Sequence, residues 1–265
     1  MNTIPTDSDV SVALFSHKRI DLLEQILYQQ IAKAHTALDL FTGDSMVTRH
    51  QSPIQLATYE VIRRALENNL TLDSTPLTPE QDAWIRVAFE NLIPDVETFL
   101  DQEITGTVSI RYSPDHAYFN YNAWQNAVVY GQRAGRLPAR TALAHELSHH
   151  AVELCLPQST GDHSAFFEGH AIGTENHFPE LLNPEAAAIV AIVRLQDLFG
   201  LYSSILCSEE PDTTLTRLND SFKIVFQRPY ASRYGIGHAL FAIAELKHGP
   251  SIYAEALRDP RVVLQ

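Results

Sequence analysis

The sequence predicts an α+β fold that is mostly helical, with a small, mainly antiparallel sheet just before a long central helix. Two observations lead to this prediction. Apolar residues recur at the helical period through most of residues 17–94 and again beyond residue 139, whereas short alternating segments fill residues 107–130. A chain of 265 residues can bury a substantial core. We expect a helical N-terminal lobe over residues 1–104 and a second domain over residues 105–265, which could together form one compact domain.

Three helices are predicted in the N-terminal lobe, and residues that start or stop helices bound each of them: 17–41, 53–69 and 79–94. Gly43 follows the first helix, and Pro53 suits the first turn of the second. Thr78 and Gln81 have the pattern of a capping box at the start of the third. We expect that helix to break or kink at Pro94, because proline lacks the backbone N–H that a helix interior needs.

Three short strands are predicted next, separated by turn residues: 107–112, 118–121 and 127–130. Four aromatic side chains gather around the second strand: Tyr118, Phe119, Tyr121 and Trp124. They could line a substrate cleft, but we favour packing in the core.

Residues 139–156 are predicted to form a helix that carries His145, Glu146 and His149 in the pattern H-E-x-x-H. The two histidines lie one turn apart, so both imidazoles project from one face and can bind one Zn²⁺. Glu146 lies about 100° round the helix, where it can deprotonate a zinc-bound water. The pentapeptide can also occur by chance, and a catalytic zinc needs a third protein ligand.

The source of the third ligand separates the known classes of such sites. A metzincin needs glycine at position 152 and histidine at position 155, where this chain has Val152 and Cys155, and both methionines lie upstream. A glutamate from the next helix fits better. Turn residues 157–162 precede a predicted helix that begins near His163 and carries Glu168.

This two-part pattern resembles the aminopeptidase N-like branch of the gluzincins, also called peptidase MA-like proteins, which read H-E-x-x-H, eighteen residues, then E-G-x-A. The chain matches the family pattern at these positions: His145, Glu146, His149, Glu168, Gly169, Ala171 and Glu175. The resemblance covers roughly residues 105–250 and implies a zincin-like fold with Glu168 as the third zinc ligand. It also implies that an edge strand binds the substrate backbone, and residues 124–130 are our candidate by position.

The resemblance further implies a tyrosine that stabilises the oxyanion, since peptide hydrolysis builds negative charge on the carbonyl oxygen. The family places this tyrosine in a Y-x-x-G pattern, which Tyr234 and Gly237 match just before an apolar helix that stops at Gly249. Tyr230 and His238 are alternative donors.

Other polar residues near the motifs are expected to have supporting or structural roles. Glu175 lies two turns from Glu168 on the same helix face and could orient a ligand histidine. Four histidines are expected to pack or to hydrogen-bond near the site rather than to bind the metal: His150, His163, His170 and His177. Cys155 and Cys207 are too few for a disulfide framework, and whether they pair stays open.

One departure from the family limits the functional interpretation. Strict aminopeptidases carry a G-x-M-E-N segment that binds the free amine of the substrate, and this chain lacks it. We therefore expect a zinc metallopeptidase that hydrolyses peptide bonds through a zinc-bound water activated by Glu146, and not a strict aminopeptidase. Two alternatives stay open. One is a non-catalytic zinc-binding interaction protein, in which a ligand such as His170 closes the site. The other is a dedicated regulatory protease that cuts one partner protein.

Net charge and hydropathy limit the classes of binding partner and the cellular location that we expect. The net charge of −13 argues against nucleic acid and anionic membranes as partners. The family resemblance implies a peptide or protein substrate. Residues 183–199 predict a buried scaffold helix, whose longest apolar run, 186–193, is too short to span a membrane. The first residues lack the features of a secretory signal, so the cytoplasm is the expected location. Cleavage preference and oligomeric state do not follow from the sequence.

Overall fold

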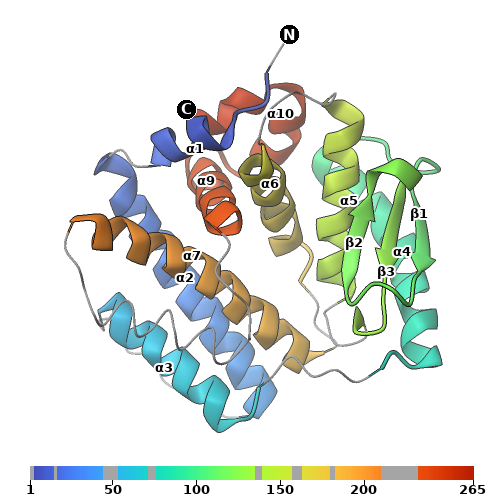
Figure 1. Cartoon of the computed structure of the whole chain (residues 1–265), viewed down its shortest axis with the longest axis horizontal. Coiled ribbons are helices and arrows are strands. Elements are labelled where there is room, and N and C mark those ends of the chain that lie inside the picture. Colours follow the sequence, from blue (N-terminus) through green and yellow to red (C-terminus); the bar gives the residue numbers. More distant parts are fainter. Residues whose placement is uncertain are drawn as a thin grey trace.

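The computed structural model describes residues 3–14, 17–43, 53–70, 76–134, 139–156, 163–179, 183–209 and 232–265. Most of these residues are helical, and a small three-stranded sheet lies at one side of the helices (Figure 1). The prediction of a mostly helical α+β fold is confirmed.

Within the described residues, four helices precede the sheet: α1 (Asp7–Leu14), α2 (His17–Thr42), α3 (Ile54–Glu67) and α4 (Pro79–Leu100). The capping box that starts α4 is present, because Thr78 Oγ1 accepts from the Gln81 N–H and the Gln81 side chain accepts from the Thr78 N–H. The expected break at Pro94 is wrong, since α4 continues through it. Leu92 and Val96 are both fully buried on either side of Pro94, so tertiary packing holds the helix together there.

The sheet consists of β1 (Ser109–Tyr112), β2 (Phe119–Asn122) and β3 (Ala127–Tyr130), in the spatial order β1-β3-β2. β3 pairs in parallel with β1 and antiparallel with β2, so the sheet is mixed rather than mainly antiparallel.

β3 is the central strand, which corrects the expectation that residues 124–130 form the substrate-binding edge. Every residue of β3 is buried, and its unbroken apolar sequence is typical of a strand covered on both faces. The edge strand beside the long central helix is β2. Trp124, in the short 3₁₀ turn between β2 and β3, is 97% exposed and takes no part in the core.

Helices α5 (Ala139–Cys155), α6 (Ser164–Asn176), α7 (Pro184–Glu209), α9 (Ser232–His248) and α10 (Ile252–Arg258) follow the sheet, with a final 3₁₀ helix η3 (Pro260–Leu264). Three predicted helix boundaries are confirmed: the starts near His163 and Pro184 and the end near Gly249. α1, α10 and η3 were not predicted, because each is too short to show a helical period.

The N-terminal helices pack directly on the helices that follow the sheet. α2 lies against α7, α4 lies against α5, and α6 makes its most extensive contact with α9. One cluster of buried apolar side chains includes residues from both predicted segments, for example Leu27 and Val96 together with Leu147 and Leu198. The N-terminal helices therefore form part of the surroundings of the motif-bearing helices.

α6 and α9 meet at two glycines. A Cβ added to Gly169 would lie 2.3 Å from the Gly237 carbonyl oxygen, and one added to Gly237 would lie 2.1 Å from the Ala165 carbonyl oxygen. No side chain fits at either position, so the two helix backbones approach closely. This contact brings the start of α9 towards Glu168 on α6.

One stretch of α7, Pro184–Ser203, is long and apolar enough by composition to cross a membrane. It is longer than the run 186–193 recognised in the sequence. In the fold, 83% of its most apolar window is buried, as in the core helix of a globular domain.

Candidate metal centre

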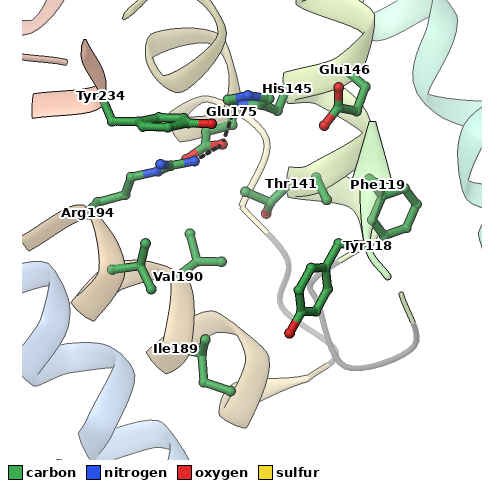
Figure 2. Close-up of a pocket in the computed structure, with 12 residues that line it drawn as sticks. Tyr118, Phe119, Thr141, His145, Glu146, Glu175, Ile189, Val190, Arg194 and Tyr234 are labelled. Atoms are coloured by element: carbon green, nitrogen blue, oxygen red, sulfur yellow. Dashed lines mark hydrogen bonds and ion pairs between the residues drawn. The ribbon is translucent and has the colours of Figure 1, made fainter. Parts of the chain in front are cut away.

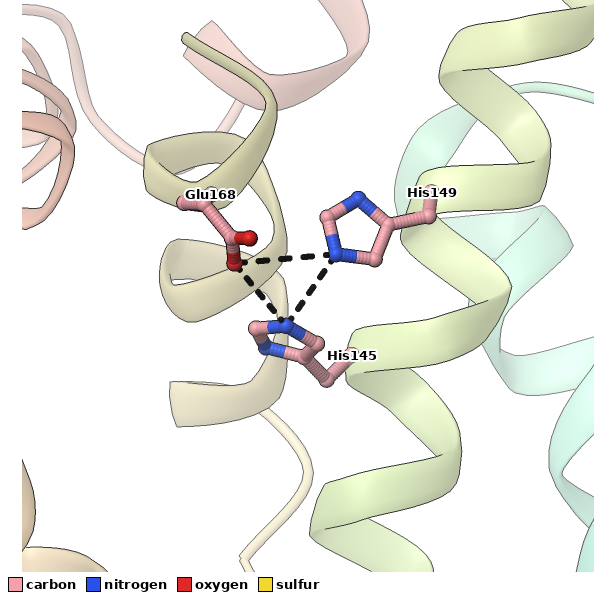
Figure 3. Close-up of side chains that lie close together, drawn as sticks. All are labelled: His145, His149 and Glu168. Atoms are coloured by element: carbon pink, nitrogen blue, oxygen red, sulfur yellow. Dashed lines mark hydrogen bonds and ion pairs between the residues drawn. The ribbon is translucent and has the colours of Figure 1, made fainter. Parts of the chain in front are cut away.

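Three side chains from two helices converge on one point (Figure 3). His145 and His149 come from α5 and Glu168 comes from α6, and one donor atom of each lies within 4.8 Å of the others. The Nε2 atoms of the two histidines are 3.2 Å apart. Glu168 Oε2 lies 3.4 Å from His145 Nε2 and 3.7 Å from His149 Nε2.

These separations fit a tetrahedral zinc site. Zinc bonds of about 2.0–2.2 Å at tetrahedral angles place two ligand atoms roughly 3.3–3.5 Å apart. The separations from Glu168 Oε2 are too long for good hydrogen bonds, and this buried oxygen has no hydrogen-bond partner among the described residues. A buried polar atom without a partner needs an explanation, and a shared divalent cation supplies one.

A row of charged side chains behind the cluster fixes one candidate ligand, His145 (Figure 2). His145 Nδ1 lies 2.9 Å from Glu175 Oε2, so the expected contact between Glu175 and a ligand histidine is present. Glu175 in turn accepts two hydrogen bonds from Arg194, and Arg194 Nη1 donates to Asp197 at 3.2 Å. Such outer contacts orient metal-binding histidines.

Arg194 and Asp197 were not identified from the sequence. Their signal in the sequence is a pair of opposite charges three residues apart in a mostly apolar helix, α7. Burial of such a pair requires partners, and Glu175 is that partner for Arg194.

The ionisation of the side chains at the cluster favours binding of a cation. Burial acts to lower the pKa of His145, but the neighbouring carboxylates of Glu168 and Glu175 outweigh it and raise that pKa to about 10. Burial lowers the pKa of His149 to about 4. Burial disfavours the ionised form of Glu168, yet the two imidazoles hold its pKa at about 2. In the protein alone, the carboxylates hold a proton on His145, in the place where a metal ion would supply positive charge.

Glu146 lies beside the cluster and faces a cavity. Burial raises the pKa of its carboxyl to about 7, against the opposing effects of His145 and of the Tyr121 N–H. The Tyr121 N–H donates to Glu146 Oε2 at 2.7 Å and belongs to the edge strand β2. A carboxyl whose pKa lies near neutrality can both accept and return a proton.

The cavity beside Glu146 and His145 has a volume of about 260 Å³. Its walls come from the end of the sheet, from α7 and from the start of α9: Tyr118, Phe119, Ile189, Val190, Val193 and Tyr234. Tyr118 and Phe119 therefore line this cavity, and Phe119 also packs against the core, as we favoured. The cavity is mainly apolar beside a polar cluster, which is typical of a small binding site.

The candidates for the oxyanion donor are placed differently. Tyr234 lines the cavity, and its hydroxyl points towards His145 in Figure 2. His238 lines another cavity, beside α2 and α10, and burial lowers its pKa to about 3. Tyr230 lies outside the described residues.

The neighbouring histidines have other partners. His170 lies 2.6 Å from Ser148 Oγ and 3.0 Å from the Tyr253 carbonyl oxygen, so its ring is engaged away from the cluster. The other contacts are those of His150 with Tyr121 and Thr107, of His163 with the Pro5 carbonyl, and of His177 with Glu245. Cys155 is a free thiol, and the side chain of Cys207 lies outside the described residues.

No protein-family model matches the chain, and no curated protein or solved structure is significantly similar to it. The family resemblance therefore rests on the motif positions in the sequence. The convergence of His145, His149 and Glu168 is an independent geometric observation.

Proposed function

We propose that this protein is a zinc-dependent peptidase of the gluzincin type, with His145, His149 and Glu168 as the metal ligands. The observation that carries the proposal is the convergence of these donor atoms at separations near those of a tetrahedral site. The cavity beside Glu146 supports a catalytic role, since it gives a substrate access to the cluster.

In the proposed mechanism each side chain around the cavity has a separate chemical role. Zinc, when bound, would acidify a water molecule and polarise the substrate carbonyl. Glu146 accepts a proton from the attacking water and passes it to the leaving amine, a role that suits a carboxyl beside both the cluster and the cavity. The Tyr234 hydroxyl donates to the developing oxyanion. Because β2 is the edge strand, we assign it the backbone-pairing role first expected for residues 124–130.

The alternative of a closed structural zinc site is less favoured. A structural site needs a fourth protein ligand, and His170, the expected candidate, is engaged by Ser148 and Tyr253. Among the described residues the cluster holds only two histidines and one glutamate. Cleavage of a single partner protein and a cytoplasmic location stay predictions.

The test is the substitution Glu146→Gln in the full-length protein. We expect wild type and variant to contain similar amounts of zinc by elemental analysis, because Glu146 is not a proposed ligand. Cleavage of a mixed fluorogenic peptide library should fall on the order of 10³-fold, since the general base is lost. Chelation and re-addition of zinc should abolish and restore wild-type cleavage.

Glu90→Gln is the matched control, because Glu90 is exposed on α4 and lines none of the cavities described above. It should leave zinc content and cleavage unchanged. Full activity in Glu146→Gln would refute the mechanism. Stoichiometric zinc in a wild type that cleaves no peptide would favour the non-catalytic alternative.

A further inference from the structure

A second hollow adjoins the cavity at the candidate metal centre. This hollow has a volume of about 630 Å³ and lies between α2 and α7. Four residues line both spaces: Thr141, Glu175, Val190 and Arg194 (Figure 2). The two spaces therefore adjoin each other at these residues.

The wall of the second hollow is mostly apolar. Seven apolar residues line it: Ala32, Ala37, Leu40, Pro179, Ala187, Val190 and Ala191. Five polar residues also contribute to the wall: Gln29, Gln30, Lys33, Thr36 and Asn176. Glu175 and Arg194 at the shared floor are bound to each other. The surface that an occupant would meet is therefore suited to aliphatic or aromatic side chains.

Leu40 lies on the side of the hollow that α2 forms. Although it lines this space, its side chain is 65% exposed. A large apolar side chain that is exposed beside an apolar hollow gains free energy when an apolar partner covers it.

We infer that the hollow between α2 and α7 binds apolar side chains of the peptide substrate at positions away from the cleaved bond. This inference rests on the proposed function, and the wall shared with the cavity at Glu146 selects the substrate as the occupant. An extended peptide advances about 3.3 Å per residue, so a segment of several residues is needed to reach from one space into the other. The preferred substrate is therefore a peptide with a run of apolar residues beyond the residue next to the scissile bond. The N-terminal helix α2 takes part in recognising it.

The experiment compares Leu40→Glu with wild type on two quenched peptides that share one cleaved core sequence. The short peptide ends next to the core, and the long one adds three apolar residues on each side. Wild type should cleave the long peptide with the higher kcat/KM. In Leu40→Glu the ratio of kcat/KM between long and short peptides should fall about tenfold, mainly through KM, as expected for loss of a leucine-sized apolar contact.

Leu56→Glu is the matched control, because Leu56 is 61% exposed on α3 and lines neither space. It should leave the ratio unchanged. A ratio that is equally unchanged in Leu40→Glu overturns the inference while the proposed function stands. If Leu40→Glu instead alters only the elution volume on size exclusion, the hollow is a contact between copies of the chain and the inference is again wrong.

Binding separates this inference from the proposed function. The labelled long peptide should bind the protein in fluorescence anisotropy, and Leu40→Glu should weaken that binding about tenfold. If binding follows this pattern but wild type cleaves neither peptide, the hollow is a peptide site and the enzymatic proposal fails. Equal binding by wild type and Leu40→Glu overturns the inference whether or not cleavage occurs.

Discussion

His145 is the most constrained side chain of the candidate metal centre. Its Nε2 faces His149 and Glu168, while its Nδ1 contacts Glu175. The ring can therefore present Nε2 to a metal only while Glu175 holds it in this orientation. Arg194 fixes Glu175 in turn through two hydrogen bonds.

We predict that Glu175→Gln weakens zinc binding by roughly 10–100-fold, the usual effect of losing a side chain that orients a ligand. Competition with a chromogenic chelator measures this affinity. Circular dichroism should show that the helices persist, because Arg194 keeps its contact with Asp197. Glu90→Gln, at an exposed position of α4, should bind zinc like wild type. Unchanged affinity in Glu175→Gln would mean that the ring is held by packing alone.

His35 gives the protein a pH-dependent stability that is independent of the metal centre. It is 5% exposed, and its Nδ1 lies 3.2 Å from Nη1 of Arg64, which is paired with Asp39. Burial, and then the Arg64 charge, lowers the pKa of His35 below its usual value. Between the two pKa values the unfolded chain therefore binds more protons than the folded one, so stability is lost as pH falls below about 6.5.

We predict that the free energy of unfolding in urea falls between pH 7.5 and 5.5 by up to about 1 kcal/mol more in wild type than in His35→Gln, since one group contributes at most about 1.4 kcal/mol per pH unit. The change with pH is compared, not the absolute stability, because the substitution itself alters packing. The same change in both proteins would contradict a role for His35.

At the scale of helices and strands, the sequence predicted the elements that carry local signals. The start of α4 follows from Thr78 and Gln81, and the end of α9 follows from Gly249, because caps depend on neighbouring residues. Strand order depends on contacts between segments that are distant in sequence. The parallel pairing of β1 with β3 and the continuation of α4 through Pro94 are consequences of such packing.

The glycine contact between α6 and α9 gives a physical reason for two motif positions. Gly169 follows the candidate ligand Glu168, and Gly237 lies one turn after Tyr234, so both glycines position candidate site residues. We predict that Gly237→Ala forces the helices apart and lowers the free energy of unfolding by about 1–3 kcal/mol, although alanine favours helices. Chemical denaturation measures the loss.

The same variant should bind zinc more weakly, because displacement of α6 moves Glu168 away from the two histidines. Glu90→Ala, an exposed helical substitution, should change stability by less than about 0.5 kcal/mol. A Gly237→Ala protein as stable as wild type would show that the close approach can relax.

At the scale of the whole molecule, the sequence predicted the residues of the candidate metal centre but not their surroundings. His145, His149 and Glu168 stand in two short motifs with a fixed spacing, and one connection between α5 and α6 brings them together. The hollow between α2 and α7 instead depends on the packing of these two helices, which is a contact between residues more than a hundred positions apart. No local sequence pattern predicts such a contact, and for that reason Arg194 and Leu40 were not recognised as residues of the site.

Because the ligands join α5 to α6, and these helices contact α4 and α9, bound zinc should stabilise the fold as a whole. At a free zinc concentration a hundredfold above the dissociation constant, linkage predicts about 2.7 kcal/mol of added stability, or a rise in Tm on the order of 5 °C. Differential scanning fluorimetry with and without zinc measures the rise, and a chelator should reverse it. Glu146→Gln should keep the rise, whereas His149→Ala and Glu168→Gln should lose it, since each removes one ligand. A rise that persists in His149→Ala would place the bound zinc elsewhere.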